Sequence, residues 1–264
     1  MVDFNKTLNK IKAVAFDLDG TLYLGNRLID GVIDTLAAIR ASGKRVCFLT
    51  NNSSSSRTQY TERLSEMGLY EEDDIFLSST MAAVDFLKTE RKDKSVFALA
   101  TDSVKEEIKG SGVELTDKNA DIALLCFDKT LNYEKILAFD NLLRGGAEYI
   151  ATHLDLVCPS ENGFIPDAGS FERMFFSSSG RSPDIVIGKP EIYMGKYLLK
   201  ILGARKEEVL FVGDRLYTDI RFANNCGFYS LLVFSGETKE SDYESSKDEA
   251  TFTAADVNVL RKYL

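Results

Sequence analysis

Short apolar runs that alternate with segments of helical periodicity constrain this chain more than any other feature of its sequence. Residues 13–18 form one such run and residues 45–50 form another, and between them apolar residues recur at helical spacing from 31 to 42. The same alternation returns between residues 184 and 234. A repeated strand–helix–strand order predicts a parallel sheet covered by helices, because parallel neighbours need a crossover connection.

A second set of predicted strands and helices lies between these two halves. Its strands are expected near residues 96–100, 122–127 and 149–152, and its helices near residues 103–109 and 133–143. We therefore expect a doubly wound α/β domain formed by residues 1–79 and 182–264, with the strand at 184–187 in its sheet. Residues 80–181 are expected to form a second α/β domain that is inserted into the first.

Composition narrows the function classes. The net charge is −9, from 41 acidic and 32 basic residues, which argues against a general nucleic-acid or membrane-surface binder. A single histidine excludes histidine-rich zinc sites and the HExxH metalloprotease motif. The four cysteines form no CxxC pair, and no run approaches the roughly 18 apolar residues of a membrane span. We expect a soluble, cytoplasmic protein whose chemistry depends on carboxylates.

Polar residues follow the predicted strands at four places, where an open parallel sheet binds its ligands. These places are Asp17-Leu18-Asp19-Gly20-Thr21, Thr50-Asn51-Asn52, Gly188-Lys189-Pro190 and the segment from Gly213 to Asp219. Each one alone could be an ordinary turn or helix cap. Together they would gather carboxylates that repel one another by about 4 kcal/mol per pair at 4 Å. A hard divalent ion such as Mg²⁺ would offset that repulsion.

These four motifs, in this order, resemble those of the haloacid dehalogenase superfamily of Mg²⁺-dependent aspartyl phosphotransferases, and the resemblance covers essentially the whole chain. The insertion between the second and third motifs, together with Leu22-Tyr23 after DxDGT, is similar to the NagD-type subfamily, subfamily IIA. The resemblance implies a Rossmann-like core with an α/β cap domain. It also implies a phosphatase of small phosphorylated metabolites or nitrophenyl phosphate, and cap-mediated homodimers occur in the family.

The resemblance also implies a role for each motif residue. Asp17 is the expected nucleophile and Asp19 the expected general acid and base. Mg²⁺ is expected to be held by Asp17, Asp214 and the backbone carbonyl of Asp19, with Asp219 orienting the metal ligands. Thr50, Lys189 and the backbone amide of Asn51 are expected to bind the phosphoryl group, with Gly20 and Asn52 beside the substrate.

Independently of the family, phosphate monoesters hydrolyse very slowly without a catalyst, and a carboxylate nucleophile divides the reaction into two easier steps. Lys189 and a metal ion can provide the positive charge that a dianionic substrate needs in an acidic site. Asp19 follows Asp17 by two residues, which suits a proton donor to the departing oxygen.

The predicted cap carries the lone histidine. The segments 151–155, 159–163 and 166–170 resemble the cap segment of the family, from which His153 and Asp167 depart. We expect His153 and Asp155 to face the leaving group, and Asp167 to disfavour strongly anionic leaving groups.

Three functions other than phosphatase share parts of this pattern. A phosphomutase or phosphotransferase could use the same acid and base, and a non-catalytic protein could bind a phosphorylated ligand. A receiver domain fits less well, because of the inserted domain and because Asp19 would speed hydrolysis.

Overall fold

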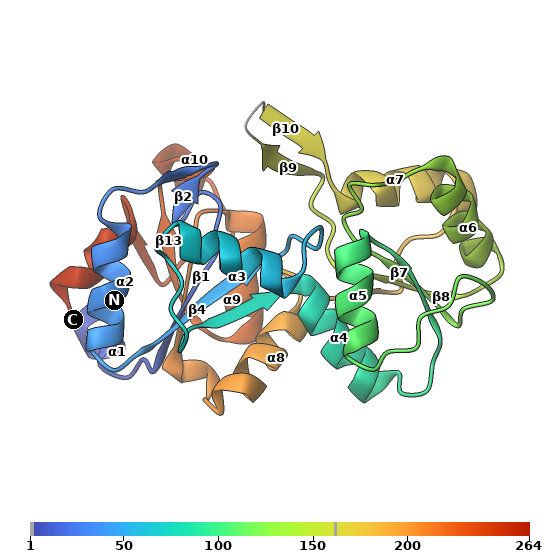
Figure 1. Ribbon diagram of the computed structural model, residues 1–264. Coiled ribbons are helices and arrows are strands. Elements are labelled where there is room, and N and C mark those ends of the chain that lie inside the picture. The colour runs from blue at the N-terminus through green and yellow to red at the C-terminus, as the bar shows by residue number, and fades with distance from the viewer. Residues whose placement is uncertain (1–2, 161–162) are drawn as a thin grey trace. The chain divides into compact units, whose positions relative to one another are not determined.

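The computed structural model describes residues 3–160 and 163–264, and the chain divides into two compact units. Unit 1 comprises residues 1–50, 61–77 and 189–264, and unit 2 comprises residues 51–60 and 78–188. The stretch 78–188 therefore interrupts unit 1 in the sequence, and the predicted insertion, 80–181, falls within it. Both chain ends belong to unit 1 (Figure 1). The ring of Phe4 contacts those of Phe252 and Tyr263 there.

Unit 1 contains a six-stranded sheet and a short hairpin. Its strands are β1 (Ala13–Phe16), β2 (Tyr23–Leu24), β3 (Arg27–Leu28), β4 (Arg45–Thr50), β5 (Ile75–Ser78), β12 (Val209–Gly213), β13 (Tyr229–Val233) and β14 (Phe252–Ala254). Its helices are α1 (Phe4–Leu8), α2 (Val32–Ala41), α3 (Arg57–Glu66, which begins in unit 2), α8 (Ile192–Leu202), α9 (Arg221–Cys226) and α10 (Glu240–Glu244). Shorter helical turns cover Lys206–Glu208, Leu216–Ile220 and Val257–Lys262.

The sheet of unit 1 has the order β14-β13-β12-β1-β4-β5. β1 lies at its centre and pairs in parallel with β12 on one side and β4 on the other. All four residues of β1 are fully buried, which explains why this strand is a continuous apolar run rather than an alternating one. The chain adds strands on one side of β1 first and on the other side later, so β1 and β12 border the point where ligands bind in such sheets.

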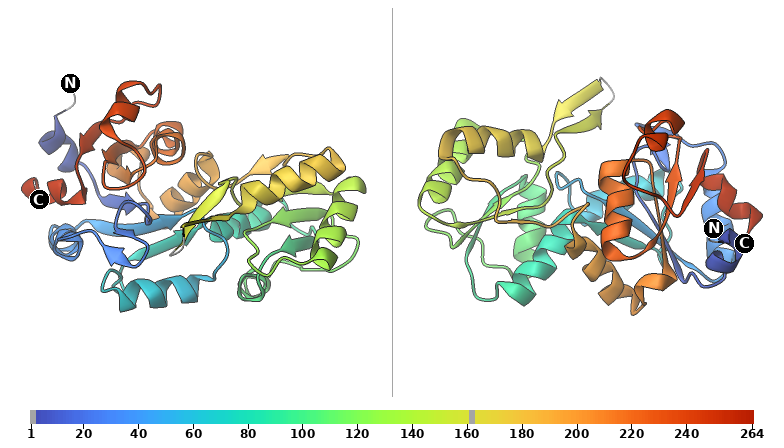
Figure 2. Two further views of the ribbon diagram at one scale, coloured as in Figure 1. Left: turned by 90° about the horizontal axis from the view of Figure 1, so that it is seen from above. Right: turned by 180° about the vertical axis from the view of Figure 1, so that it is seen from behind.

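Unit 2 is a smaller α/β unit with a four-stranded sheet in the order β11-β8-β7-β6 and a separate hairpin, β9-β10 (Figure 2). Its strands are β6 (Val96–Leu99), β7 (Ile122–Leu125), β8 (Glu148–Ala151), β9 (Val157–Ser160), β10 (Gly163–Pro166) and β11 (Ile185–Val186). Its helices are α4 (Ser79–Glu90), α5 (Asp102–Gly110), α6 (Tyr133–Arg144) and α7 (Ala168–Ser179). Phe139 is central to its core, with ring centroids 4.6 Å from Phe175 and 5.5 Å from Tyr149.

The two parallel sheets with flanking helices confirm the predicted fold class. One strand is placed differently from the prediction. The strand expected at 184–187 in the sheet of the first domain is β11, which pairs in parallel with β8 of unit 2. An apolar run reveals a buried strand but not the sheet that it joins, and β11 lies directly before the return of the chain to unit 1 at Lys189.

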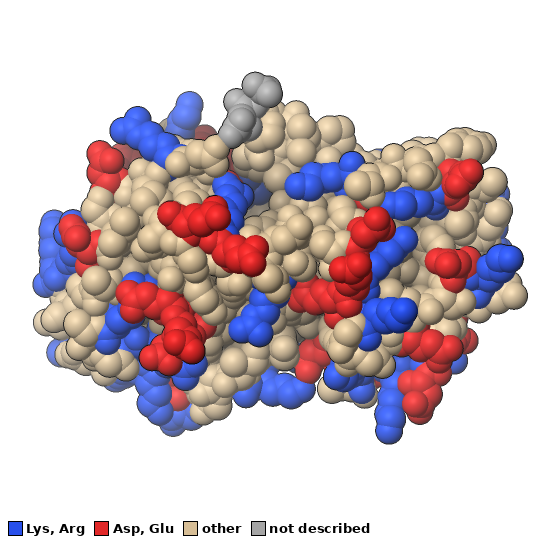
Figure 3. Space-filling view, in the orientation of Figure 1, with Lys and Arg blue, Asp and Glu red and all other residues tan. Residues whose placement is uncertain are grey.

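Three further findings bear on the compositional arguments. No helix of the described ranges has the length and apolarity needed to cross a bilayer. Within the same ranges the four cysteines form no disulfide, and Cys47 and Cys126 are buried. On the face in Figure 3, acidic and basic side chains are interspersed rather than separated into patches of one sign.

Candidate active site

The ends of the two central strands of unit 1 bring acidic side chains together. β1 pairs with β12 in register, Phe16 opposite Val212, and the amide of Asp17 donates to the carbonyl of Val212 at 2.8 Å. Asp17 therefore follows β1 beside the end of β12, which leads directly to Asp214. Asp17, Asp214 and Asp219 each offer a carboxylate oxygen within 4.8 Å of the others. The structure therefore brings three of the motif acids together.

Glycines leave room for these carboxylates. A Cβ on Gly20 would lie 2.2 Å from Oδ2 of Asp214, and Gly20 also has φ +87°, which side chains rarely adopt. A Cβ on Gly236 would lie 2.0 Å from the same oxygen, and one on Gly213 would lie 2.3 Å from Cβ of Asp219. The Asp214 carboxylate is thus enclosed by backbone, and Gly20 lies against it. That Gly20 lies beside the substrate stays a prediction.

Lys189 joins two of the acids. Its Nζ donates to Oδ1 of Asp17 at 2.5 Å and to Oδ1 of Asp219 at 2.7 Å, and its side chain is 2% exposed. Burial disfavours the charged lysine, but the carboxylates of Asp17 and Asp219 outweigh burial and raise its pKa. Lys189 is therefore a fixed cation of the site.

For the acids, burial is the largest influence on the pKa. It raises the pKa of Asp17 to about 7, even though the Lys189 ammonium favours the ionised form. Burial, together with the neighbouring Asp219 and Asp17 carboxylates, raises the pKa of Asp214 well above its usual range. The protein alone does not fully compensate these charges, so their ionised state calls for additional positive charge.

Asp19 stands apart from the three grouped acids, since its side chain is not a member of the carboxylate group found among the described residues. It lies in the turn after β1, where the amide of Gly20 donates to the carbonyl of Tyr23 at 2.8 Å. Burial raises the pKa of Asp19, against the opposing charges of Arg63 and Arg215. A raised pKa suits a carboxyl group that must donate a proton.

The second motif divides between the two units. Thr50 ends β4, the strand next to β1, and is 6% exposed. Asn51 and Asn52 belong to unit 2, where Nδ2 of Asn51 donates to Oδ2 of Asp155 at 3.1 Å. Nδ2 of Asn52 approaches Sγ of Cys158 at 3.5 Å. The structure thus connects the second motif to the predicted cap residue Asp155.

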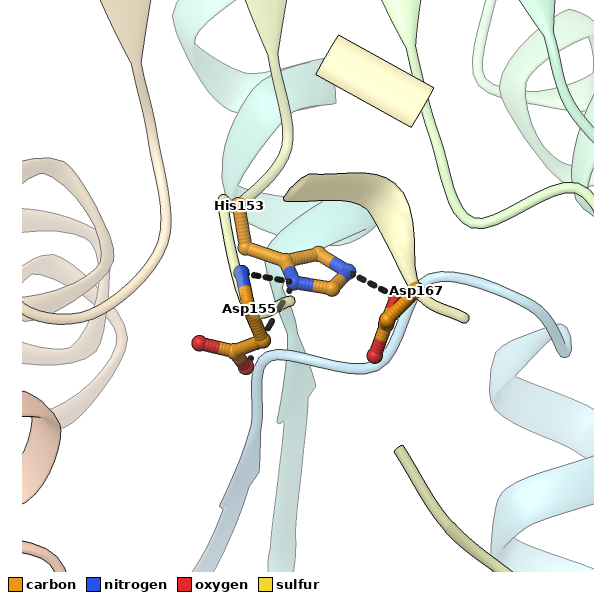
Figure 4. A group of neighbouring side chains, drawn as sticks. All are labelled: His153, Asp155 and Asp167. Carbon is orange, nitrogen blue, oxygen red and sulfur yellow. Dashed lines mark hydrogen bonds and ion pairs between the residues drawn. The ribbon is translucent and has the colours of Figure 1, made fainter. Parts of the chain in front are cut away.

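His153 bridges two carboxylates within unit 2 (Figure 4). Its Nδ1 lies 3.4 Å from Oδ2 of Asp155, and its Nε2 lies 3.5 Å from Oδ1 of Asp167. The histidine is completely buried and Asp167 is 3% exposed, at the start of α7, where it accepts from the amide of Ala168. The backbone amide of Asp155 also donates to Nδ1 at 3.4 Å, and the three side chains offer polar atoms within 4.8 Å of one another.

Two roles in unit 2 stay predictions. One is that His153 and Asp155 contact the leaving group, and the other is that Asp167 disfavours strongly anionic leaving groups. Asp155 is the most exposed of the three side chains, at 17%. The cap segment 159–163 lies partly outside the described residues, since 161 and 162 are not among them.

Sequence reasoning missed two features of unit 1. Arg215 follows Asp214 directly, and its backbone amide donates to Oδ2 of Asp219 at 3.1 Å. The segment 235–238 follows β13, and the amide of Glu237 donates to Oδ2 of Asp214 at 2.7 Å. Arg215 lies inside the GDxxxxD motif, and this position in the sequence could have indicated that it belongs to the site. The segment 235–238 offered no acidic pair or motif to single it out.

Comparisons with known proteins identify the family. The haloacid dehalogenase-like hydrolase pattern matches residues 14–114, and a second HAD-hydrolase-like pattern matches residues 186–260. The 5′-nucleotidase YutF of Bacillus subtilis is 30% identical over 240 residues, which cover 91% of this chain and 93% of that protein. The structure of 4-nitrophenylphosphatase from Thermotoga maritima superposes with a TM-score of 0.92 at 36% identity, covering 97% of this chain and 98% of that one.

A solved structure described as a putative nagD protein has a TM-score of 0.90 at 35% identity and covers 99% of both chains. The family patterns, the relative and the solved structures agree on one family. The chain therefore belongs to the haloacid dehalogenase superfamily, as a phosphatase of the NagD type.

Proposed function

We propose that this phosphatase hydrolyses phosphate monoesters of small metabolites, with Mg²⁺ as its cofactor, through an aspartyl-phosphate on Asp17. The observation that carries the proposal is the pairing of Asp17 with buried Lys189 inside a group of three carboxylates. A nucleophile, a fixed cation and a set of metal ligands are then within one small region at the end of the central strands.

The donor set fits Mg²⁺. All three grouped side chains offer carboxylate oxygens, the ligands that Mg²⁺ prefers, and the raised pKa values of Asp17 and Asp214 indicate uncompensated negative charge. Asp17, Asp214 and the carbonyl of Asp19 would hold the ion, and Asp219 would orient its ligands. When bound, the ion neutralises charge on the transferring phosphoryl group.

Two proton-coupled steps complete the proposed reaction. The Asp17 carboxylate forms a bond to phosphorus as the ester oxygen leaves, and Asp19 transfers its proton to that oxygen. Asp19, now ionised, then takes a proton from water while the water oxygen attacks the same phosphorus. Inorganic phosphate leaves and the Asp17 carboxylate is restored. Lys189 favours the ionised form of Asp17 that the first step needs and, with Thr50 and the amide of Asn51, would bind the phosphoryl oxygens.

Unit 2 is proposed to select the leaving group, as the cap domain predicted for residues 80–181, with His153 and Asp155 as the residues that choose it. The compared proteins act on a nucleotide and on nitrophenyl phosphate according to their names, so both compounds are suitable substrates to test. We further propose a cytoplasmic location, which fits four cysteines that form no disulfide.

A phosphate-release screen tests the proposal. Sugar phosphates, nucleotides, phosphoglycolate, pyridoxal phosphate and nitrophenyl phosphate are each incubated with the wild type and with Asp17→Asn, with and without Mg²⁺. The expected result is Mg²⁺-dependent phosphate release by the wild type and none by Asp17→Asn. Asp34→Asn makes the same chemical change on a side chain that is 75% exposed and should keep full activity.

Two results would count against the proposal. Retained activity in Asp17→Asn would remove the nucleophile. Transfer of the phosphoryl group to an added sugar acceptor, without release of inorganic phosphate, would make the enzyme a phosphotransferase.

A further inference from the structure

The segment 235–238 closes over Asp214 from the neighbouring strand. Besides the contact of the Glu237 amide with the Asp214 carboxylate, the amide of Thr238 donates to the carbonyl of Asp214 at 3.3 Å. Oγ of Ser235 donates to the carbonyl of Gly20 at 2.8 Å. The segment thus connects the first motif to the fourth, and none of the roles proposed above uses it.

Glu237 also carries a side-chain contact toward the fourth motif. Its Oε2 lies 3.0 Å from Nε of Arg215, and its Oε1 accepts from the hydroxyl of Tyr217 at 2.8 Å. The side chain of Arg215 is 16% exposed and that of Glu237 is 46% exposed. The half-exposed side chain of Glu237 therefore contacts an arginine that is largely buried.

Arg215 is a permanent cation next to the acidic group. Its charge lowers the pKa values of Asp17, Asp19 and Asp214, against the stronger effect of burial on each. Among the described residues its side chain makes one ion pair, with Glu237 through Nε. A guanidinium has five N–H donors, so the two terminal nitrogens remain for an anionic ligand.

Lys189 cannot meet the whole demand of a phosphate dianion. Its ammonium already donates to two carboxylates, which reduces the charge that it can offer to an incoming phosphoryl group. A planar guanidinium suits phosphate oxygens because it can donate two parallel hydrogen bonds.

We propose that Arg215 is a second phosphate-binding cation of this site and that Glu237 is the positioning residue that holds its guanidinium. The inference rests on the proposed function and adds a residue to it. Glu237 acts through Arg215, so its contribution to phosphate binding disappears once Arg215 is gone.

A double-mutant cycle tests this dependence. Arg215→Ala, Glu237→Gln and the double variant are compared for KM, kcat and the Ki of inorganic phosphate, with nitrophenyl phosphate as substrate. The affinity for inorganic phosphate is also measured by its effect on the unfolding temperature. Arg221→Ala is the matched control, because Arg221 forms an ion pair with Asp248 at 2.8 Å outside the site.

Arg215→Ala should raise KM and the phosphate Ki about tenfold or more, the loss expected for a charge-assisted hydrogen bond. Glu237→Gln should raise the phosphate Ki about threefold, in the range of a half-exposed ion pair. The double variant should match Arg215→Ala alone. Arg215→Lys keeps the charge and should recover part of the affinity, and it replaces Arg215→Ala in the cycle if that variant does not fold.

An unchanged phosphate Ki in the Arg215 variants, or additive effects in the cycle, would overturn the inference while leaving the phosphatase assignment intact. A wild type that releases no phosphate from any ester would instead overturn the proposed function. The two failures are therefore distinguishable.

Discussion

Neutralising Asp17, the proposed nucleophile, should stabilise the metal-free protein. Burial raises the pKa of Asp17 from 3.8 to about 7 in the folded protein. Each pKa unit corresponds to about 1.4 kcal/mol, so a shift of roughly three units means that ionising Asp17 costs the folded state about 4 kcal/mol at pH 8. Asp17→Asn removes this charge and keeps an oxygen that can accept from Lys189.

The effect depends on pH with a definite sign. The folded pKa lies above the unfolded one, so the folded state binds the Asp17 proton more tightly and stability is lost as pH rises through about 7. The asparagine has no such loss. The advantage of Asp17→Asn should therefore grow from about 2 kcal/mol at pH 5 to about 4 kcal/mol at pH 8. At pH 8 this corresponds to an increase of roughly 10 °C in unfolding temperature.

Calorimetric unfolding in EDTA between pH 5 and pH 8 measures this difference, with Asp34→Asn as the surface control. Adding Mg²⁺ should stabilise the wild type more than Asp17→Asn, because the ion compensates the negative charge of the Asp17 carboxylate, which the variant does not have. A lower unfolding temperature for Asp17→Asn at pH 8, or a difference that does not change with pH, would refute the electrostatic reasoning.

Three further substitutions have distinct expected outcomes. Lys189→Met leaves Asp17 and Asp219 without their shared cation, so the metal-free protein should lose about 3–5 kcal/mol of stability at pH 8. The variant should also release no phosphate from its substrates, and retained activity would contradict the role of Lys189. Gly236→Ala places a methyl group against Asp214, and the resulting displacement should lower kcat/KM about a hundredfold in a phosphate-release assay. His153→Ala should change the ranking of kcat/KM over a panel of phosphomonoesters, and an unchanged ranking would remove His153 from substrate selection.

The sequence predicted the centre of unit 1 well, because both faces of a central parallel strand are buried. β4 coincides with the predicted strand at 45–50, and β1 lies within the predicted run 13–18. The acids that follow β1 and β12 could be located from the same logic, since the ends of neighbouring parallel strands share one edge of the sheet. Asp17, Asp214 and Asp219 are grouped there.

Contacts made across the chain were not predictable in this way. The segment 235–238 reaches Asp214 because β13 lies beside β12, and no local pattern encodes that neighbour. Arg215 occupies a position that the motif spacing leaves unspecified. The bridge from His153 to Asp167 joins the end of β8 to the start of α7, and it depends on the tertiary fold of unit 2.

The proposed mechanism requires that Asp17 carries the phosphoryl group during turnover. The most direct measurement mixes the wild type with Mg²⁺ and nitrophenyl phosphate, quenches it in acid within the first turnover, and locates the phosphoryl group by mass spectrometry of the digested protein. We expect a phosphorylated peptide that contains Asp17, and no such peptide from Asp17→Asn. A phosphoryl group on another residue, or phosphate release by Asp17→Asn at the wild-type rate, would contradict it.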